Sequence, residues 1–186
     1  MDAIAIDVTA IKKGGKMGMV TIDATTIDSM VENALAFCAQ KTGLRDGEAL
    51  EAVRRGDCSV CSYLRYGLSK EIGAYLGDID TSVQAVYTYE PEYSIGLDDV
   101  YRATDRGIHL IVSVDRRSAA LASIIASLED GLGDARKRLV CSKANGSCHA
   151  LDVKVADEEQ VASRRGYGAL ISSIYVRPLR IWAREN

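Results

Sequence analysis

The sequence predicts an α+β protein that contains a ferredoxin-like βαββαβ unit over about residues 108–176, elaborated by an N-terminal hairpin and helices. From Ile108 onward the periodic segments come in the order strand, helix, strand, strand, helix, strand, and both crossover segments have the length of a helix. No break in composition divides the chain, so we expect one domain over residues 1–186. Within it, 1–107 supplies a hairpin, helices and one strand, and 108–186 is the ferredoxin-like portion.

Hydrophobic periodicity places the elements of the N-terminal portion. Apolar residues alternate on both sides of a Gly- and Lys-rich turn, which predicts a hairpin over residues 3–24. The clearest helix covers residues 26–42, because its apolar positions form a single stripe: Ile27, Met30, Val31, Ala34, Leu35 and Cys38. Further helices are predicted at 46–54, 60–76 and 97–105, and a half-buried strand at 83–90.

The ferredoxin-like portion opens with residues 108–114, which are apolar on both faces, as is typical of a central strand. A helix then begins at Asp115 or Ser118 and carries an apolar stripe. Gly131 and Gly133 are expected to end this helix. Together the two segments form the first strand and helix of the predicted unit.

A hairpin, a helix and further strands complete the predicted unit. The Asn145-Gly146 pair favours a two-residue turn between two strands. The strands on either side of it cover 138–143 and 148–155, a helix capped by Asp157 runs through Arg165, and strands follow at 169–176 and 179–183. Pro178 favours an edge position for the last strand. We expect 108–114 and 148–155 to be the adjacent central pair of an antiparallel sheet.

Composition indicates a soluble protein of a reducing compartment. Of the 186 residues 47% are hydrophobic and 26% charged, which is ordinary for a globular domain. No apolar run is long enough to cross a membrane, and the N-terminus lacks a basic region followed by an apolar one, so we expect neither a membrane span nor a secretory signal. The five cysteines are an odd number, which together with these observations favours a cytoplasmic location with free thiols.

The net charge of −3 is unevenly distributed along the chain. Residues 71–115 carry nine acids and two arginines, or −7, whereas residues 116–186 carry twelve bases and eight acids, or +4. One interpretation is that these charges lie on solvated faces. The other is that complementary patches orient the copies of a homo-oligomer, most simply a dimer. Tyrosines in 83–90 and Trp182 favour the second, because aromatic residues are enriched at interfaces.

Four cysteines form the candidate chemical site. Cys58 and Cys61 form a CxxC pair, and Cys141 and Cys148 would share one face of the Asn145-Gly146 hairpin, so the four could hold a structural zinc ion. Alternatively, Cys58 and Cys61 could be a redox pair, because a helix N-terminus lowers the pKa of a thiol. The third interpretation is that all four are separate free thiols. Cys38 is expected to be buried and inert.

The remaining candidate residues are weaker. His109 lies in an apolar strand, where a core or interface role is more common than catalysis, and His149 would point away from the cysteine pair. No catalytic or cofactor motif is present, so we nominate no catalytic or cofactor-binding residue and leave enzymatic activity open. Basic and aromatic residues interleave near the C-terminus: Arg164, Arg165, Tyr167, Tyr175, Arg177, Arg180, Trp182 and Arg184. This pattern is compatible with single-stranded nucleic acid, but the acidic total makes nucleic acid an unfavoured partner.

Three functional hypotheses follow. The leading one is a non-enzymatic small-molecule-binding or assembly domain, because a ferredoxin-like sheet has an open face that a ligand or partner can cover. The second is a structural-metal or thiol-redox module that uses Cys58, Cys61, Cys141 and Cys148. The third is a nucleic-acid-binding domain that uses the basic C-terminal region.

Overall fold

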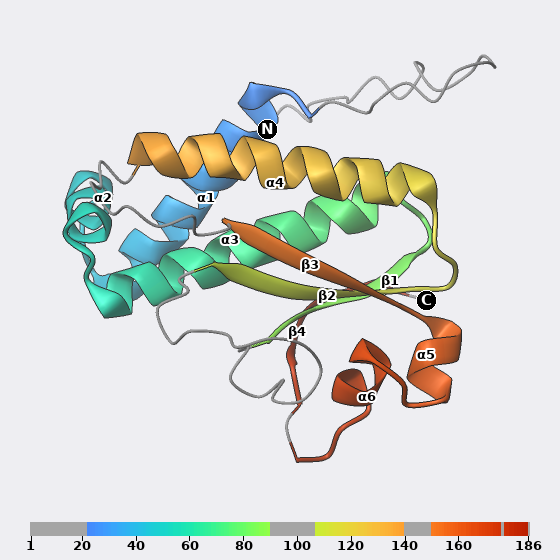
Figure 1. Ribbon diagram of the computed structural model, residues 1–186. Coiled ribbons are helices and arrows are strands. Elements are labelled where there is room, and N and C mark those ends of the chain that lie inside the picture. Colours follow the sequence, from blue (N-terminus) through green and yellow to red (C-terminus); the bar gives the residue numbers. More distant parts are fainter. Residues whose placement is uncertain (1–21, 90–106, 140–149, 176, 186) are drawn as a thin grey trace.

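The computed structural model describes residues 22–89, 107–139, 150–175 and 177–185. Within these ranges the chain is of the α+β class, with helices packed against a four-stranded mixed sheet (Figure 1). In chain order the elements are α1 (Ala24–Thr42), α2 (Asp46–Arg55), α3 (Cys58–Ile79), β1 (Val83–Thr88), β2 (Ile108–Val114), α4 (Ala119–Leu139), β3 (Leu151–Asp157), α5 (Glu158–Ala162), α6 (Tyr167–Ile171) and β4 (Leu179–Ala183). None of these helices combines the length and the apolarity that crossing a membrane requires.

The sheet joins strands from both portions of the chain, in the order β3-β2-β1-β4. β1 is antiparallel to β2 and to β4, so it lies between two strands that come later in the sequence. β2 and β3 run parallel, with Ile108 opposite Leu151 and Val114 opposite Asp157. The predicted adjacency of 108–114 and 148–155 is therefore confirmed, but the central pair of this sheet is β1 and β2, and the sheet is mixed rather than antiparallel.

Helices α1, α3 and α4 lie on one side of the sheet, and the short helices α5 and α6 lie on the other (Figure 1). α3 packs on β1 and β4, α4 packs on β3, and α1 packs on both long helices. Apolar side chains from these helices and from one face of the strands form a continuous core. Burial of such surface provides about 25 cal/mol per Å², which makes this core the main source of stability.

Local sequence signals explain where the N-terminal helices begin and end. The Asp23 carboxylate accepts a hydrogen bond from the Thr26 backbone amide at 2.7 Å and caps α1. Gly43 ends that helix in a left-handed conformation, with a φ of 71°. The predicted stripe of α1 is buried, apart from Leu35, which is half-buried. The predicted helix over 26–42 is therefore confirmed.

Helix α4 is longer than predicted, because Gly131 and Gly133 do not end it. The apolar stripe continues through them, and Leu132 and Ala135 are both buried. Gly131 lies where α4 meets α1, and a Cβ atom there would be 2.9 Å from Ile27 Cγ1. This glycine is thus a site of close helix packing. The strand predicted at 138–143 is wrong at its first two residues, which are helical, and its remainder lies outside the described residues.

The strand predicted at 169–176 is also wrong, because residues 167–171 form α6. The helix after the Asp157 cap ends at Ala162, and α6 then folds back onto it. At Gly168 a Cβ atom would lie 2.2 Å from the Gln160 carbonyl oxygen, so the two short helices meet through this glycine. With a helix at this position, and with β4 paired to β1, the described residues do not form the predicted βαββαβ unit.

Other predictions are confirmed or lie outside the described residues. β1 and β4 occupy the strands predicted at 83–90 and 179–183, and β4 is at an edge of the described sheet. The hairpin over 3–24 falls almost entirely outside, but its last residue, Ala24, begins α1 and is not a strand residue. The helix at 97–105 and the Asn145-Gly146 turn also lie outside.

Candidate functional site

The two faces of the sheet differ in chemistry. On β2, Leu110 and Val112 belong to the apolar core under the helices, whereas His109, which alternates with them, points to the opposite face. His109 is directly opposite Asp152 on β3. We call this opposite face, with Tyr89, His109, Asp152 and Lys154, the polar face of the sheet.

A buried histidine and a carboxylate form the centre of the polar face. The His109 side chain is only 4% exposed, and its Nδ1 lies 3.6 Å from Asp152 Oδ2. Lys154 Nζ lies 3.1 Å from the other oxygen of the same carboxylate. Burial acts to raise the pKa of Asp152, but hydrogen bonding to His109 and Lys154 outweighs it, and the pKa lies below its ordinary value. The folded protein therefore holds Asp152 as a carboxylate between two donors.

Two aromatic rings, those of Tyr89 and Tyr167, pack against His109 and Lys154. The ring of Tyr89 meets His109 edge-on, with centroids 5.8 Å apart, and lies 6.2 Å from Tyr167 of α6. Lys154 Nζ lies over the Tyr167 ring at 5.7 Å from its centroid. Such edge-on and cation–π contacts contribute about 0.5–1.5 kcal/mol each beyond area burial. His109 and Tyr89 are thus packed against each other, and Tyr89 also against Tyr167, beside the Asp152 carboxylate.

A cavity of about 530 Å³ borders the polar face, and Tyr89 and His109 form part of its wall. Its described lining comes from three parts of the chain: the first half of α3, the ends of β1 and β2, and a C-terminal group made of Leu170, Tyr175 and residues 177–179. This volume is in the range of small-molecule sites, which are usually concave and contain a few convergent polar groups.

The α3 wall consists of Ser62, Arg65, Tyr66 and Ser69, which are spaced i, i+3, i+4 and i+7 and so share one helix face. The Ser69 hydroxyl donates to the Arg65 carbonyl at 2.8 Å, and Arg65 Nη2 lies 3.4 Å from Ser62 Oγ. The Tyr66 ring packs against Phe37 of α1, with centroids 5.7 Å apart. This face of α3 is therefore polar and aromatic, and its aromatic residue, Tyr66, is supported by Phe37.

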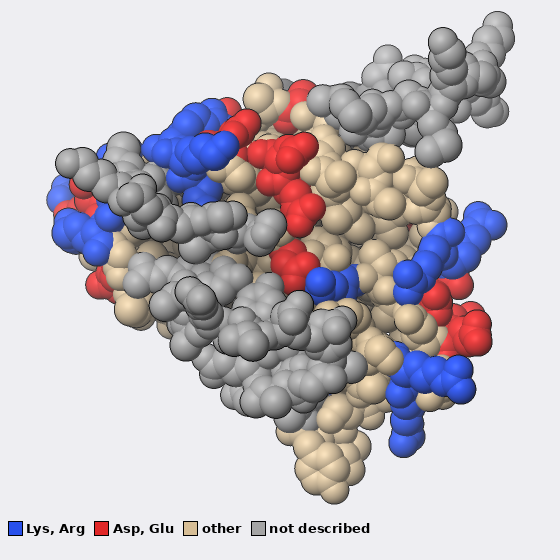
Figure 2. All heavy atoms as spheres, in the orientation of Figure 1, with Lys and Arg blue, Asp and Glu red and all other residues tan. Residues whose placement is uncertain are grey.

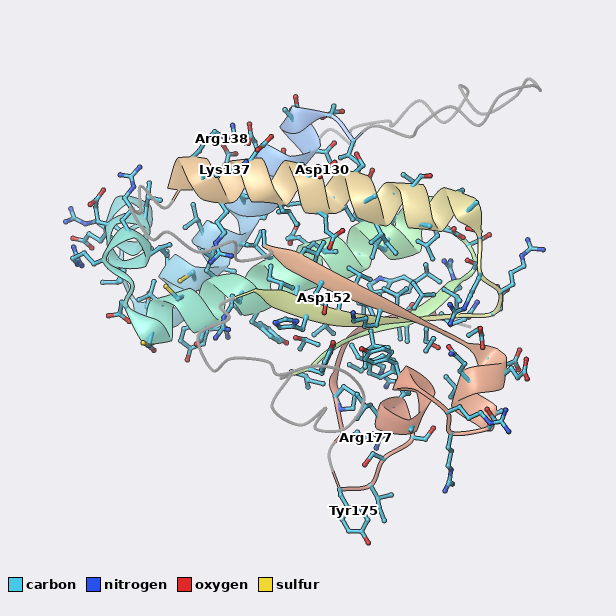
Figure 3. The ribbon with its side chains drawn as sticks, in the orientation of Figure 1. Asp130, Lys137, Arg138, Asp152, Tyr175 and Arg177 are labelled. Carbon is cyan, nitrogen blue, oxygen red and sulfur yellow. The ribbon has the colours of Figure 1, made fainter. Side chains whose placement is uncertain are left out.

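The opposite wall comes from the segment that leads into β4. Tyr175 and Arg177 line the cavity from this side. Tyr175 is 91% exposed and points away from the sheet at the tip of the segment (Figure 3), so it marks the rim of the cavity. Arg177 is exposed and forms no ion pair with the described residues.

The described residues of the lining carry a net positive charge, because they include two arginines but neither aspartate nor glutamate. By contrast, basic and acidic side chains lie next to each other elsewhere on the face shown in Figure 2. Arg138 of α4, for example, is paired with Asp28 of α1 at 2.7 Å, and Arg117 with Asp157 at 2.8 Å. The described part of the lining is thus cationic on a protein whose net charge is −3.

The CxxC pair lies at the start of α3, as predicted, but a carboxylate already occupies the amides of that helix end. Asp57 caps the helix, and its carboxylate accepts hydrogen bonds from the Ser59 and Val60 amides at 3.0 and 3.1 Å. The amides that would stabilise a thiolate are thus engaged by a carboxylate. Cys58 is exposed and Cys61 half-buried.

The other cysteines give no metal site within the described residues. Cys38 is fully buried, as predicted, and its thiol donates to the Val60 carbonyl at 3.3 Å. Burial raises the pKa of Cys38, and the nearby Cys61 and Asp57 raise it further. Cys141 and Cys148 lie outside the described residues, which contain no cluster of three His, Cys, Asp or Glu side chains suited to a metal ion. The zinc hypothesis therefore remains a prediction.

The basic and aromatic residues near the C-terminus do not form one continuous surface. Trp182 packs on α3, where a Cβ atom at Gly77 would lie 2.0 Å from its ring. Arg184 donates from Nη2 to the carbonyls of Gly77 and Asp80, at 2.7 and 3.2 Å, and from Nε to Val83 at 3.1 Å. These two members of the pattern are therefore used in packing and in capping α3.

Searches against protein-family models, curated proteins and solved structures give no match to this chain. The chemistry of the cavity lining is therefore the basis for a functional conclusion. The sequence analysis did not nominate Arg65 or Tyr66 as site residues. The available signal was the spacing of Ser62, Arg65, Tyr66 and Ser69, which places polar and aromatic side chains on one face of the helix.

Proposed function

We propose that the protein is a non-enzymatic small-molecule-binding domain whose ligand occupies the cavity between α3, the ends of β1 and β2, and the lining residues Leu170, Tyr175 and 177–179. The observation that carries this proposal is the lining itself, in which polar groups from three separate parts of the chain converge on one space of ligand size. This is the function that the sequence analysis favoured, but the proposed ligand position is this cavity and not an open face of a ferredoxin-like sheet.

The hydroxyl groups of the lining support binding over nucleophilic catalysis. A nucleophilic serine or threonine needs a general base within hydrogen-bond reach of its oxygen. Ser62 and Ser69 each donate to a carbonyl one turn earlier in α3, at 2.8 Å, and Thr88 donates to the His109 carbonyl at 3.3 Å. All three hydroxyl groups are therefore directed to the backbone rather than to the His109 ring.

The test is to block the cavity without disturbing the core. Ser62 is exposed at the cavity wall, so Ser62→Trp should fill the space at little cost to folding. Ser123→Trp on α4 is a matched control, because both serines donate to the carbonyl four residues earlier and Ser123 is not in the lining. Each protein is dialysed against a small-molecule extract of the expression host, and retained compounds are identified by mass spectrometry.

The expected result is a compound retained near one equivalent by the wild type and by Ser123→Trp, and lost in Ser62→Trp. Equal retention by all three proteins, or by none, would contradict the proposal. Unfolding midpoints of the three proteins show whether each variant is folded.

The proposal includes a cytoplasmic homo-oligomer. Cys38 and Cys58 are free thiols, which suits a reducing compartment. Ile174, Tyr175 and Leu179 are exposed large apolar residues close together in the chain, a pattern typical of contact surfaces. Light scattering at micromolar concentration and physiological salt should report a dimer, and a monomer would contradict this part of the proposal.

A further inference from the structure

We infer that the ligand of this cavity is an oxyanion that carries a planar ring, and that Arg65 and Arg177 bind its anionic group. This inference rests on the proposed function and adds the chemical class of the ligand. It follows from three properties of the lining: its charge, the type and position of its cations, and its preordered aromatic rings.

The charges of the described lining residues disfavour a cationic ligand. Arg65 and Arg177 are guanidinium cations, and the described lining contains no carboxylate to offset them. The Asp152 carboxylate, next to the lining residue His109, is already paired with Lys154 at 3.1 Å and lies 3.6 Å from His109. A bound cation would therefore meet two positive groups and no negative partner among the described lining residues.

The cations are arginines that come from opposite walls. A guanidinium group presents parallel N–H donors whose spacing matches the oxygens of a phosphate or carboxylate. Arg65 is half-buried, and its Nη2 lies 3.4 Å from Ser62 Oγ, so part of its hydration is already replaced by the protein. A charge-assisted hydrogen bond is stronger in such a position than in bulk water. Neither arginine forms an ion pair with a described residue.

The aromatic rings of the lining indicate a ring on the ligand. Tyr66 is braced by Phe37 at 5.7 Å, and Tyr89 is held by His109 at 5.8 Å and Tyr167 at 6.2 Å. Both are half-buried, so each keeps an exposed part beside the cavity. Because these side chains are already held by their neighbours, stacking on them costs little additional conformational entropy.

Four probe compounds distinguish the contribution of the anionic group to binding from that of the aromatic ring. Phenyl phosphate and benzoate carry both features with two different oxyanions, inorganic phosphate carries only the anion, and phenyltrimethylammonium carries the ring with a positive charge. Binding of each is measured by isothermal titration to the full chain. We expect the two aromatic anions to bind about tenfold more tightly than inorganic phosphate, and phenyltrimethylammonium to bind more weakly than either. The stronger of phenyl phosphate and benzoate then identifies the preferred oxyanion.

Arginine variants locate the binding group. Arg65→Gln and Arg177→Gln should each weaken the better aromatic anion about tenfold, as loss of one charge-assisted hydrogen bond predicts. Arg180→Gln is the matched control, because Arg180 is an exposed residue of β4 outside the lining, and it should leave binding unchanged. Arg65→Lys keeps the charge but not the planar fork, so it should restore part of the affinity lost in Arg65→Gln.

Two results would overturn the inference. One is tighter binding of phenyltrimethylammonium than of both aromatic anions. The other is unchanged anion binding in both glutamine variants, with unfolding midpoints equal to that of the wild type. If Ser62→Trp still blocks retention of a neutral or cationic compound from the extract, the cavity is a binding site and only the ligand class assigned here is wrong. If Ser62→Trp blocks nothing, the proposed function itself fails.

Discussion

The two faces of the sheet differ in the side chains that the same strands present and in what those side chains contribute. Toward α3 and α4 the strands present Leu110, Val112 and other buried apolar side chains, which pack without polar partners. Toward α5 and α6 they present His109, Asp152 and Lys154, each placed by a specific contact. The comparison teaches that the stability of this chain resides mainly on the helix-covered face. The polar face is therefore able to carry charged and aromatic groups whose identity matters for binding.

The strongest test of this contrast removes one side chain from each face. Leu110→Ala creates a cavity at a fully buried position and should lower the free energy of unfolding by about 2–5 kcal/mol. Lys154→Ala, on the polar face, should lower it by less than about 1 kcal/mol, because that side chain is 36% exposed. Urea denaturation measures both. Comparable losses would mean that the two faces contribute equally to stability.

The next largest effect concerns close packing of α3 on β4. A Cβ atom at Gly77 would lie 2.0 Å from the Trp182 ring, so Gly77→Ala must displace that ring and should destabilise the protein by about 1–3 kcal/mol. Gly133→Ala is the control, because nothing lies within 4 Å of its Cβ position, and its higher helix propensity should stabilise α4 by up to about 1 kcal/mol. Thermal unfolding should thus shift in opposite directions, and two shifts of the same sign would contradict this account.

Substitution of Arg184 tests whether a charged side chain also contributes to stability on the helix-covered side of the sheet. It donates to the carbonyls of Gly77, Asp80 and Val83, which include acceptors at the end of α3. Arg184→Gln should lower the free energy of unfolding by about 1–2 kcal/mol, since partly buried acceptors lose a charged donor. Hydrogen exchange should show the loss concentrated at the end of α3 and in β1. Uniform loss of protection across all helices would contradict a capping role.

The smallest effect is the pH dependence contributed by Asp152. Despite burial, its hydrogen bonds to His109 and Lys154 hold its pKa below the ordinary 3.8. Its contribution to stability is therefore complete above about pH 4 and is lost as the pH falls through the folded-state pKa. Asp152→Asn should be less stable than the wild type at about pH 6, and the difference should shrink toward about pH 3. Denaturation curves that keep a constant separation over this range would contradict the assignment.

Sequence periodicity was sufficient for the elements that rely on local signals. The stripe from Ile27 to Cys38, the alternation in 83–88 and the apolar run at 108–114 all describe residues whose burial is set by their own segment. It failed at two glycines. Gly131 was interpreted as a helix end and a strand was predicted from residue 169, whereas Gly131 allows the Ile27 side chain, and Gly168 the Gln160 backbone, to approach closely. A glycine has the same local propensity in both situations, so only the partner element distinguishes them.

The candidate site was less predictable than the fold. The CxxC pair was placed correctly at a helix start, but Asp57 gives that start a carboxylate where a reactive thiol needs free amides. The cavity depends on Arg65, His109 and Arg177, which are up to 112 positions apart in the sequence. Their convergence follows from the pairing of β1 with both β2 and β4, and no periodicity within one segment encodes such a pairing.

The pairing of β1 with β4 affects how the chain folds during synthesis. β1 ends at Thr88, and its partner on one side begins only at Leu179, so about 90 residues must be synthesised before the second edge of β1 is covered. At roughly 5–20 residues per second this interval lasts about 5–20 s on the ribosome. Contacts of such sequence separation also slow refolding of the complete chain. The nascent protein therefore passes through a period in which a buried strand of the final sheet has an open edge, and this strand is its main point of vulnerability to aggregation.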